Sequence, residues 1–252
     1  MVLVEEFDAS TDAANPTEVW FGTLCGGSEM YLSSLVFYAE AWGIELGLHV
    51  RFRQAFSCEE DLNKDEFSAV NNITGTDGCV HFACINDLAA NPLSARTTSG
   101  ERRALPTKDG KLRFIVAGTS CKEASRLSQK HKRDGDGRDA VNTSSGSTGG
   151  TFKSFVVIQQ YLKVRRILQE NALTVFDVSA KTGKSNYQCM EHCWNTATPP
   201  HAFVCCDMSA STGGIPCRRP RLYMDGRPME GEEATLPDRA PPSLQNRKGP
   251  QR

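Results

Sequence analysis

The chain has 252 residues, a formal net charge of −1 and 39% hydrophobic residues. That length holds one large domain or two small ones, and the near-zero charge predicts no overall attraction to nucleic acid, so any basic surface must be local. No apolar run approaches the length of a transmembrane helix. The ten cysteines do not indicate a disulfide framework, because the chain is long and begins MVLVEEFDAS, which has acids where a signal peptide is basic. We therefore expect an intracellular protein with free thiols.

The N-terminal part predicts the opening of a nucleotide-binding unit. Residues 1–17 are polar and acidic, and we expect a flexible lead-in there. An apolar run from Val19 then meets a glycine turn, and apolar residues follow at close to helical spacing over 30–46. Strand, glycine turn and helix begin a βαβ unit in which free backbone N–H groups bind a ligand. An ordinary tight turn explains the same glycines, so the pattern alone leaves both readings open.

A second strand is predicted over 50–56, and acidic residues follow it. An acid at this place, 20–30 residues after the glycine turn, is where such folds bind a ribose, and either Glu59 or Asp61 fits. The competing interpretation is a solvated acidic turn that caps a helix over 62–70.

The next strands lead to a cysteine. A third strand is predicted over 79–85, a polar loop over 91–111 and a buried fourth strand over 114–117, which ends at Gly118-Thr119-Ser120-Cys121. A cysteine just past a buried strand lies where open α/β sheets place their chemistry, and Lys122 beside it would favour the nucleophilic thiolate. The alternative is a packing residue, since free cysteine is among the most buried residue types.

The remainder completes an α/β pattern. Residues 128–150 are rich in Gly, Ser and charge and predict a mobile loop, whose basic run 130–133 suits either phosphate binding or plain solvation. Residues 152–168 are mostly helical and end in a short fifth strand over 164–168. We expect a helix over 186–194, strands over 203–206 and 222–224, and a disordered tail over 227–252. The predicted fold is a doubly wound, mostly parallel sheet.

Three groups of reactive side chains lie just outside predicted strands: Cys121, Glu170 and the arginines Arg218, Arg219 and Arg221. In a doubly wound sheet these strand ends share one crevice. A thiol, an acid and arginines in one crevice suit conjugate addition to a heterocycle.

With these motifs in this order, the chain resembles the cytosine-5 DNA methyltransferase family over about residues 19–226. Five segments carry the resemblance: Gly22-Thr23-Leu24-Cys25-Gly26-Gly27, Glu59, Gly118-Thr119-Ser120-Cys121, Glu170-Asn171-Ala172, and Gly214-Ile215-Pro216-Cys217-Arg218-Arg219-Pro220-Arg221-Leu222-Tyr223. The last segment is close to the family's Gly-x-Pro-Gln-x-Arg-x-Arg run.

The resemblance implies a Rossmann-like fold of the S-adenosylmethionine-dependent methyltransferase type, with a catalytic domain over 18–226. It implies that Cys121 adds to C6 of a flipped-out cytosine, that Glu170 holds and protonates N3, and that Arg219 and Arg221 contact the base and backbone. It also implies DNA as the partner and a nuclear location. The cofactor, S-adenosylmethionine, would be bound by Gly22, Thr23, Leu24, Cys25, Gly26, Gly27, Glu59, Asp87 and Gly118.

The chain also departs from the family's pattern. Ser120 replaces the usual proline, Leu24 replaces a glycine, and Cys217 replaces a glutamine. Cys84 stands where an acid often contacts the adenine, which leaves Asp87 as its substitute. The target-recognition region and the last motif have no counterpart in 227–252, so either a second chain supplies target recognition or this is a truncated, catalytically silent binding protein.

Two further alternatives concern the substrate and a metal. A tRNA-methylating branch shares the same motifs, so RNA is the alternative substrate to DNA. Cys189, His192 and Cys193 fall on one helical face and invite a zinc site, with Cys205 and Cys206 nearby. Zinc sites usually show cleaner Cys-x-x-Cys pairs, and we expect no metal.

Overall fold

The structure is a computed structural model that describes residues 11–25, 40, 43–64, 66, 78–108, 111–124, 136–144, 146–209 and 220–229. The strands are β1 (Thr17–Leu24), β2 (Val50–Cys58), β3 (Val80–Phe82), β4 (Ala95–Arg96), β5 (Arg102–Arg103), β6 (Leu112–Ala117), β7 (Arg166–Ala172), β8 (His201–Ser209) and β9 (Pro220–Pro228). The helices are α3 (Ile85–Ala90), α5 (Ala140–Thr143), α6 (Gly146–Leu162) and α7 (Asn186–Asn195), with 3-10 turns η3 (Asp136–Asp139) and η4 (Leu173–Phe176).

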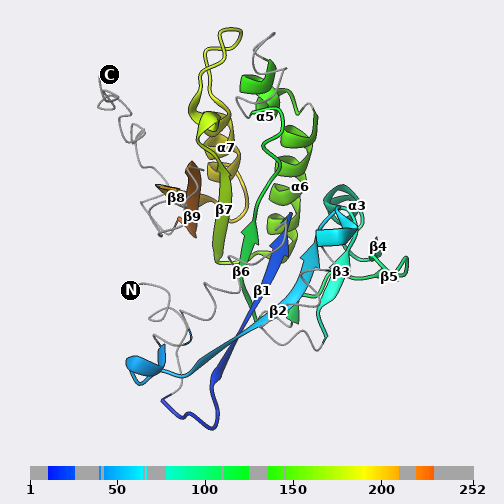
Figure 1. Ribbon diagram of the computed structural model, residues 1–252, viewed down its shortest axis with the longest axis vertical. Helices are drawn as coiled ribbons and strands as arrows, with labels where there is room; N and C mark the ends of the chain where they lie inside the picture. Colours follow the sequence, from blue (N-terminus) through cyan, green and yellow to red (C-terminus); the bar gives the residue numbers. More distant parts are fainter. Residues whose placement is uncertain are drawn as a thin grey trace.

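Seven strands form one twisted sheet in the order β3-β2-β1-β6-β7-β9-β8. Within this sheet, β3, β2, β1, β6 and β7 run parallel to one another, whereas β9 is antiparallel to both β7 and β8. Figure 1 shows the arrowheads of β1, β2 and β6 pointing to the same end of the sheet. The predicted doubly wound, mostly parallel architecture is confirmed, and the carboxyl ends of its central strands form one edge.

Each face of the sheet has its own core, because central parallel strands are apolar on both sides. On one face, α6 and α7 cover the sheet, and Trp194 packs edge-to-face against Phe155 at 5.0 Å between ring centroids. On the other face, Phe21 of β1 stacks on Phe114 of β6 at 5.2 Å. These two layers fix the register of β1 and β6, whose ends carry the predicted site.

Several predicted boundaries are corrected. The third strand ends at Phe82, because Cys84 is already the N-cap of α3 and its carbonyl accepts from the Leu88 N–H. From residue 136 on, the described part of the predicted mobile loop is mostly helical, because η3, α5 and the start of α6 lie there. Its first part, 128–135, lies outside the described residues, as does most of each predicted helix over 30–46 and 62–70.

The antiparallel pairing of β7 with β9 explains a further correction. Glu170 and Arg221 were expected just outside strands, but both lie within them, in the register Glu170↔Tyr223 and Ala172↔Arg221. Because β7 and β9 pair through backbone hydrogen bonds, each strand extends beyond the residues that the sequence predicted. β9 reaches Pro228, two residues beyond the expected end of the domain at 226.

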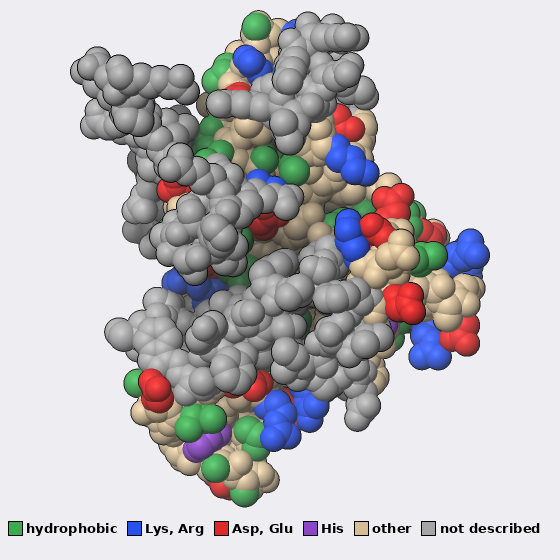
Figure 2. Space-filling view, viewed as in Figure 1, with side chains coloured by type: hydrophobic (Ala, Val, Ile, Leu, Met, Phe, Trp, Pro, Cys, Tyr) green, Lys and Arg blue, Asp and Glu red, His purple; other side chains and the backbone are tan. Residues whose placement is uncertain are grey.

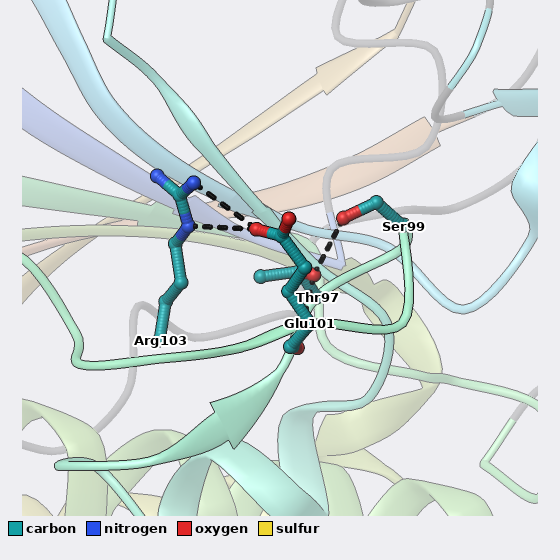
Figure 3. A network of polar contacts seen from close by, with 4 residues as sticks. All are labelled: Thr97, Ser99, Glu101 and Arg103. Atoms are coloured by element: carbon teal, nitrogen blue, oxygen red, sulfur yellow. Dashed lines mark hydrogen bonds and ion pairs between the residues drawn. The ribbon is translucent and has the colours of Figure 1, made fainter.

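The predicted polar loop over 91–111 contains a small antiparallel pair, β4 and β5. Its turn is held by side chains: Thr97 Oγ1 lies 2.9 Å from Ser99 Oγ, and Arg103 donates through Nε and Nη2 to Glu101 (Figure 3). Among the helices of the described ranges, none combines the length and apolar character needed to cross a bilayer.

Candidate active site at the carboxyl ends of the strands

Backbone hydrogen bonds join the strand ends into one rim. The Gly118 N–H donates to the Leu24 carbonyl at 3.0 Å, which ties the end of β6 to the end of β1. The Cys25 N–H donates to the Cys58 carbonyl at 2.7 Å, and the Glu59 N–H to the Phe82 carbonyl at 3.2 Å. The ends of four strands, β1, β2, β3 and β6, therefore lie together at one edge of the sheet.

Cys121 lies on this rim in the loop that follows β6. The residue is half-buried at this edge of the sheet. The preceding Ser120 is fixed on α6, where its N–H donates to Thr151 Oγ1 at 3.2 Å and its hydroxyl lies 3.0 Å from Ser147 Oγ. A proline in place of Ser120 would have no N–H to donate, so the loop here is held by hydrogen bonds instead of a ring.

A buried network ties the Cys121 loop to β7. Thr119 is 2% exposed, and its hydroxyl oxygen accepts from Gln169 Nε2 and from Asn171 Nδ2, each at 3.1 Å. Gln169 is held in turn by Trp194, whose Nε1 donates to Gln169 Oε1 at 3.4 Å. The two amides flank Glu170 in sequence, so this network fixes the loop beside Glu170.

Glu170 points to the opposite face of the sheet from its two neighbours, because side chains alternate along a strand. Its Oε1 forms an ion pair with Arg221 Nε at 2.6 Å. A Cβ atom added to Gly118 would lie 3.7 Å from Glu170 Oε2, so the carboxylate reaches over the start of the Cys121 loop. The structure thus brings together three parts of the predicted catalytic set: the Cys121 loop, Glu170 and Arg221. Arg219 lies outside the described residues.

The first three residues of the predicted glycine turn belong to the packed interior of the sheet. A Cβ at Gly22 would overlap the Phe56 ring, Thr23 Oγ1 accepts from Gln54 Nε2 at 2.8 Å, and Leu24 is buried in the core. The backbone of all three residues pairs with β2 on one side and β6 on the other. Gly26 and Gly27 lie outside the described residues, and the binding role of this segment stays a prediction.

Cys25 is the last described residue of that turn and adopts a left-handed backbone with φ of 53°. Burial, with the nearby negative charges of Glu59 and Glu60, raises the pKa of its thiol to about 12. The Cys25 thiol is therefore neutral at physiological pH and cannot serve as a second nucleophile.

Of the two acids that the sequence left open after β2, Glu59 fits the rim. It is 9% exposed, and its Oε1 accepts from the Asp61 N–H at 3.0 Å. Asp61 instead pairs with Lys64 at 3.3 Å on the surface. Glu59 lies at the strand end near Cys25, and its ribose-binding role stays a prediction.

Asp87 has a different bonding pattern. Its carboxylate accepts from the Arg96 N–H at 2.7 Å and from Asn91 Nδ2 at 3.1 Å, and the Arg96 bond is the main cause that lowers its pKa. Both oxygens therefore brace the loop between α3 and β4. The expected contact of Asp87 with an adenine stays a prediction.

The sequence reasoning missed the residues that hold the site. Glu123, Ser147, Thr148 and Thr151 connect the Cys121 loop to α6, and they fell in or next to a segment expected to be a loop. The residues that suggested a zinc alternative form no metal cluster: within the described ranges, no group of three or more His, Cys, Asp or Glu side chains is placed to hold a metal.

Charge on the surface is mixed. Figure 2 shows basic side chains interspersed with acidic ones over the described part of the visible face. This distribution agrees with the net charge of −1 and favours local contacts over a broad electrostatic surface.

Comparison with known proteins adds information on the fold. No protein-family model matches the chain, and no curated protein matches it. Among solved structures, the Dnmt2 methyltransferase of S. pombe matches with a TM-score of 0.50 and 14% identity, over 85% of this chain and 52% of that protein. A putative DNA modification methyltransferase encoded within an E. coli prophage (TM-score 0.45, 14% identity, 89% and 52% covered) and the Entamoeba histolytica methyltransferase EhMeth (0.45, 10%, 84% and 54%) are more distant.

The chain therefore spans about half the length of the solved structures it matches. At these identities the likeness concerns the backbone and not the chemistry. Taken with the strand order, it shows that the chain shares the mostly parallel α/β fold of the S. pombe methyltransferase.

Proposed function

We propose that the chain transfers a methyl group from S-adenosylmethionine to C5 of cytosine in DNA, through a covalent adduct with Cys121. The observation that carries the proposal is the convergence of the Cys121 loop on the Glu170–Arg221 ion pair at the carboxyl end of β6. A nucleophilic thiol and a carboxylate held by an arginine are the groups that conjugate addition to a cytosine ring requires. The fold shared with a protein described as a methyltransferase supports the same reaction class.

Each residue has a defined part in this reaction. The Cys121 thiolate adds to C6 of a flipped-out cytosine, and the ring electrons shift so that C5 becomes nucleophilic. Glu170 holds N3, and a proton that its carboxyl group takes up from solvent passes to N3 as negative charge develops there and returns to Glu170 when the adduct breaks down. Arg221 holds the Glu170 carboxylate in place, and we propose that Arg219 contacts the adjacent backbone. After methylation, loss of the C5 proton to solvent expels the Cys121 thiolate.

The residues of the β1–β2 rim fit the cofactor in part. The Glu59 carboxylate lies where a ribose is bound in such folds. At Gly118, a Cβ atom would lie 2.7 Å from the Cys25 carbonyl oxygen, so the glycine lets the two backbone segments approach closely. We propose that Glu59 and the backbone at Cys25 and Gly118 hold S-adenosylmethionine. When bound, this cofactor supplies the electrophilic methyl group as a sulfonium.

Target recognition is a separate proposal. Because the chain spans about half of the solved structures it matches, we propose that a second chain or a further segment supplies the contacts that select the DNA sequence. DNA as substrate also implies a nuclear location in a cell with a nucleus.

A transfer assay tests the reaction. The chain is incubated with radiolabelled S-adenosylmethionine and either duplex DNA or tRNA, and Cys121→Ser is run beside the wild type. The proposal predicts label in DNA that the variant fails to transfer, because a hydroxyl is far less nucleophilic at neutral pH. If only tRNA is labelled, the substrate is RNA and not DNA. If Cys121→Ser labels DNA as well as the wild type does, the reaction does not pass through a Cys121 adduct.

A further inference from the structure

Glu123, two residues after Cys121, caps the N-terminus of α6. Its carboxylate accepts from the Ser147 N–H at 3.2 Å and the Thr148 N–H at 2.8 Å, and Ser147 Oγ donates to it as well. Burial alone would raise the pKa of Glu123, but the hydrogen bonds from Thr148 and Ser147 outweigh it and lower the pKa to about 2. The side chain is therefore a carboxylate whose charge faces the positive end of the helix.

The first turn of α6 binds the loop in return. Thr148 Oγ1 accepts from the Glu123 N–H at 3.2 Å, and Thr151 Oγ1 accepts from the Ser120 N–H at the same distance. Cys121 is thus held from both sides, by Ser120 before it and Glu123 after it. We call this set of contacts between Ser120, Glu123, Ser147, Thr148 and Thr151 the α6 clasp.

The helix that supports the clasp is itself well anchored. α6 is 17 residues long, and its Phe152 and Phe155 are fully buried against Trp194. A loop that is hydrogen-bonded to such a helix is held in one conformation more firmly than a loop bonded only to residues adjacent in sequence.

We propose that Glu123 is a positioning residue, which acts through the α6 clasp to set the place of the Cys121 thiol relative to Glu170. The inference rests on the proposed role of Cys121 as the nucleophile. A nucleophile displaced by about 1 Å loses on the order of 100-fold in rate, so a carboxylate that never touches the substrate still controls turnover.

Thiol alkylation measures the position of Cys121 independently of methyl transfer. The full chain is treated with iodoacetamide and the labelling rate of each cysteine is mapped by mass spectrometry, with the exposed Cys206 as internal reference. Glu123→Ala removes the carboxylate contacts that join the clasp to Ser147 and Thr148, and we expect Cys121 labelling to accelerate about fivefold or more relative to Cys206. Glu123→Gln keeps one acceptor oxygen and should fall between Ala and the wild type.

A matched control removes a different helix cap. Ser185 caps α7 by accepting from the Gln188 N–H at 3.2 Å, so Ser185→Ala weakens a helix without touching the clasp. It should leave the Cys121 rate unchanged. Ser147→Ala approaches the clasp from the helix side and carries the test if Glu123→Ala does not fold.

The outcomes separate the two claims. A Cys121 rate in Glu123→Ala and Ser147→Ala within about twofold of the wild type, or an equal rise in Ser185→Ala, overturns the positioning role. In the transfer assay, Glu123→Ala should lower kcat about 10- to 100-fold and leave the KM for S-adenosylmethionine unchanged. A wild type that transfers no methyl group to DNA contradicts the proposed function, while the alkylation rates still decide the role of Glu123.

Discussion

The two halves of the rim use their polar side chains differently. At the end of β6, Thr119, Ser120 and Glu123 are bound by side chains from β7 and α6, so that the loop around Cys121 has one defined path. At the end of β1, Gly22 and Thr23 serve the contact between β1 and β2, and Cys25 is held through its backbone. The comparison indicates that the half proposed to be catalytic is held by side-chain bonds to β7 and α6, whereas the half proposed to bind the cofactor is held by the packing of β1 on β2 and by backbone bonds.

Matched threonine variants give the largest expected difference. Thr119→Val leaves the buried donors of Gln169 and Asn171 without their shared acceptor, which should lower the free energy of unfolding by about 3 kcal/mol. Thr23→Val removes one acceptor, that of Gln54, and should cost about 1.5 kcal/mol. Urea unfolding measures both. Equal losses would mean that the Thr119 network adds nothing special to the catalytic half.

The cofactor tests the other half. S-adenosylmethionine at 100 times its dissociation constant should stabilise the wild type by about 2.7 kcal/mol, seen as a rise in Tm. Glu59→Ala should abolish most of that rise at the same concentration, because it removes the carboxylate at the ribose position. Asp61→Ala is the control, since Asp61 pairs with Lys64 on the surface. A wild type whose Tm does not move at saturating cofactor would contradict the assignment of this rim.

A variant of Gly22 distinguishes a packing role of this glycine from a role in cofactor binding. Gly22→Ala places a methyl group against the Phe56 ring, and overpacking of this kind should cost about 2 kcal/mol. The double variant with Phe56→Leu should recover part of the loss, which unfolding curves of the three proteins reveal. If Gly22→Ala instead weakened cofactor binding at full stability, the glycine would belong to the ligand site.

Substitution of Glu123 should change the free energy of unfolding least, and this change should depend on pH. Its pKa is lowered from 4.5 to about 2, so the carboxylate stabilises the folded state above pH 4.5, and this contribution is lost as pH falls toward about 2. At pH 7, Glu123→Gln should lower the free energy of unfolding by about 1 kcal/mol, as expected for a weakened helix cap. The difference from wild type should shrink steadily between pH 4.5 and 2. A difference that is constant over this range would exclude ionisation of Glu123 as its cause.

The sequence predicts most of the sheet because buried strands have a simple pattern. Runs such as Phe114 to Ala117 are apolar on both faces, and acids, glycines or a cysteine mark their ends. Glu59 and Cys121 were found in this way. The insertion of β9 between β7 and β8 has no local signal, which is why Glu170 and Arg221 were expected outside strands.

The start of α6 was missed for a different reason. Its glycines and serines predict a loop by composition, but Gly149 lies where a Cβ would overlap the Ala140 carbonyl and the Ser144 backbone. Close packing with α5 therefore requires the residue that helix propensity disfavours. The α6 clasp depends on this tertiary contact, so the partners of Glu123 could not be read from the sequence.

Covalent trapping tests the central claim most directly, namely that Cys121 is the nucleophile of the β6–β7 crevice. The chain is incubated with DNA that contains 5-fluorocytosine and with S-adenosylmethionine, and the adduct is digested and mapped by mass spectrometry. The fluorine at C5 prevents release of the thiolate, so the account predicts a stable protein–DNA complex joined at Cys121 and absent in Cys121→Ser. An adduct at another cysteine, or a complex that persists in Cys121→Ser, would contradict it.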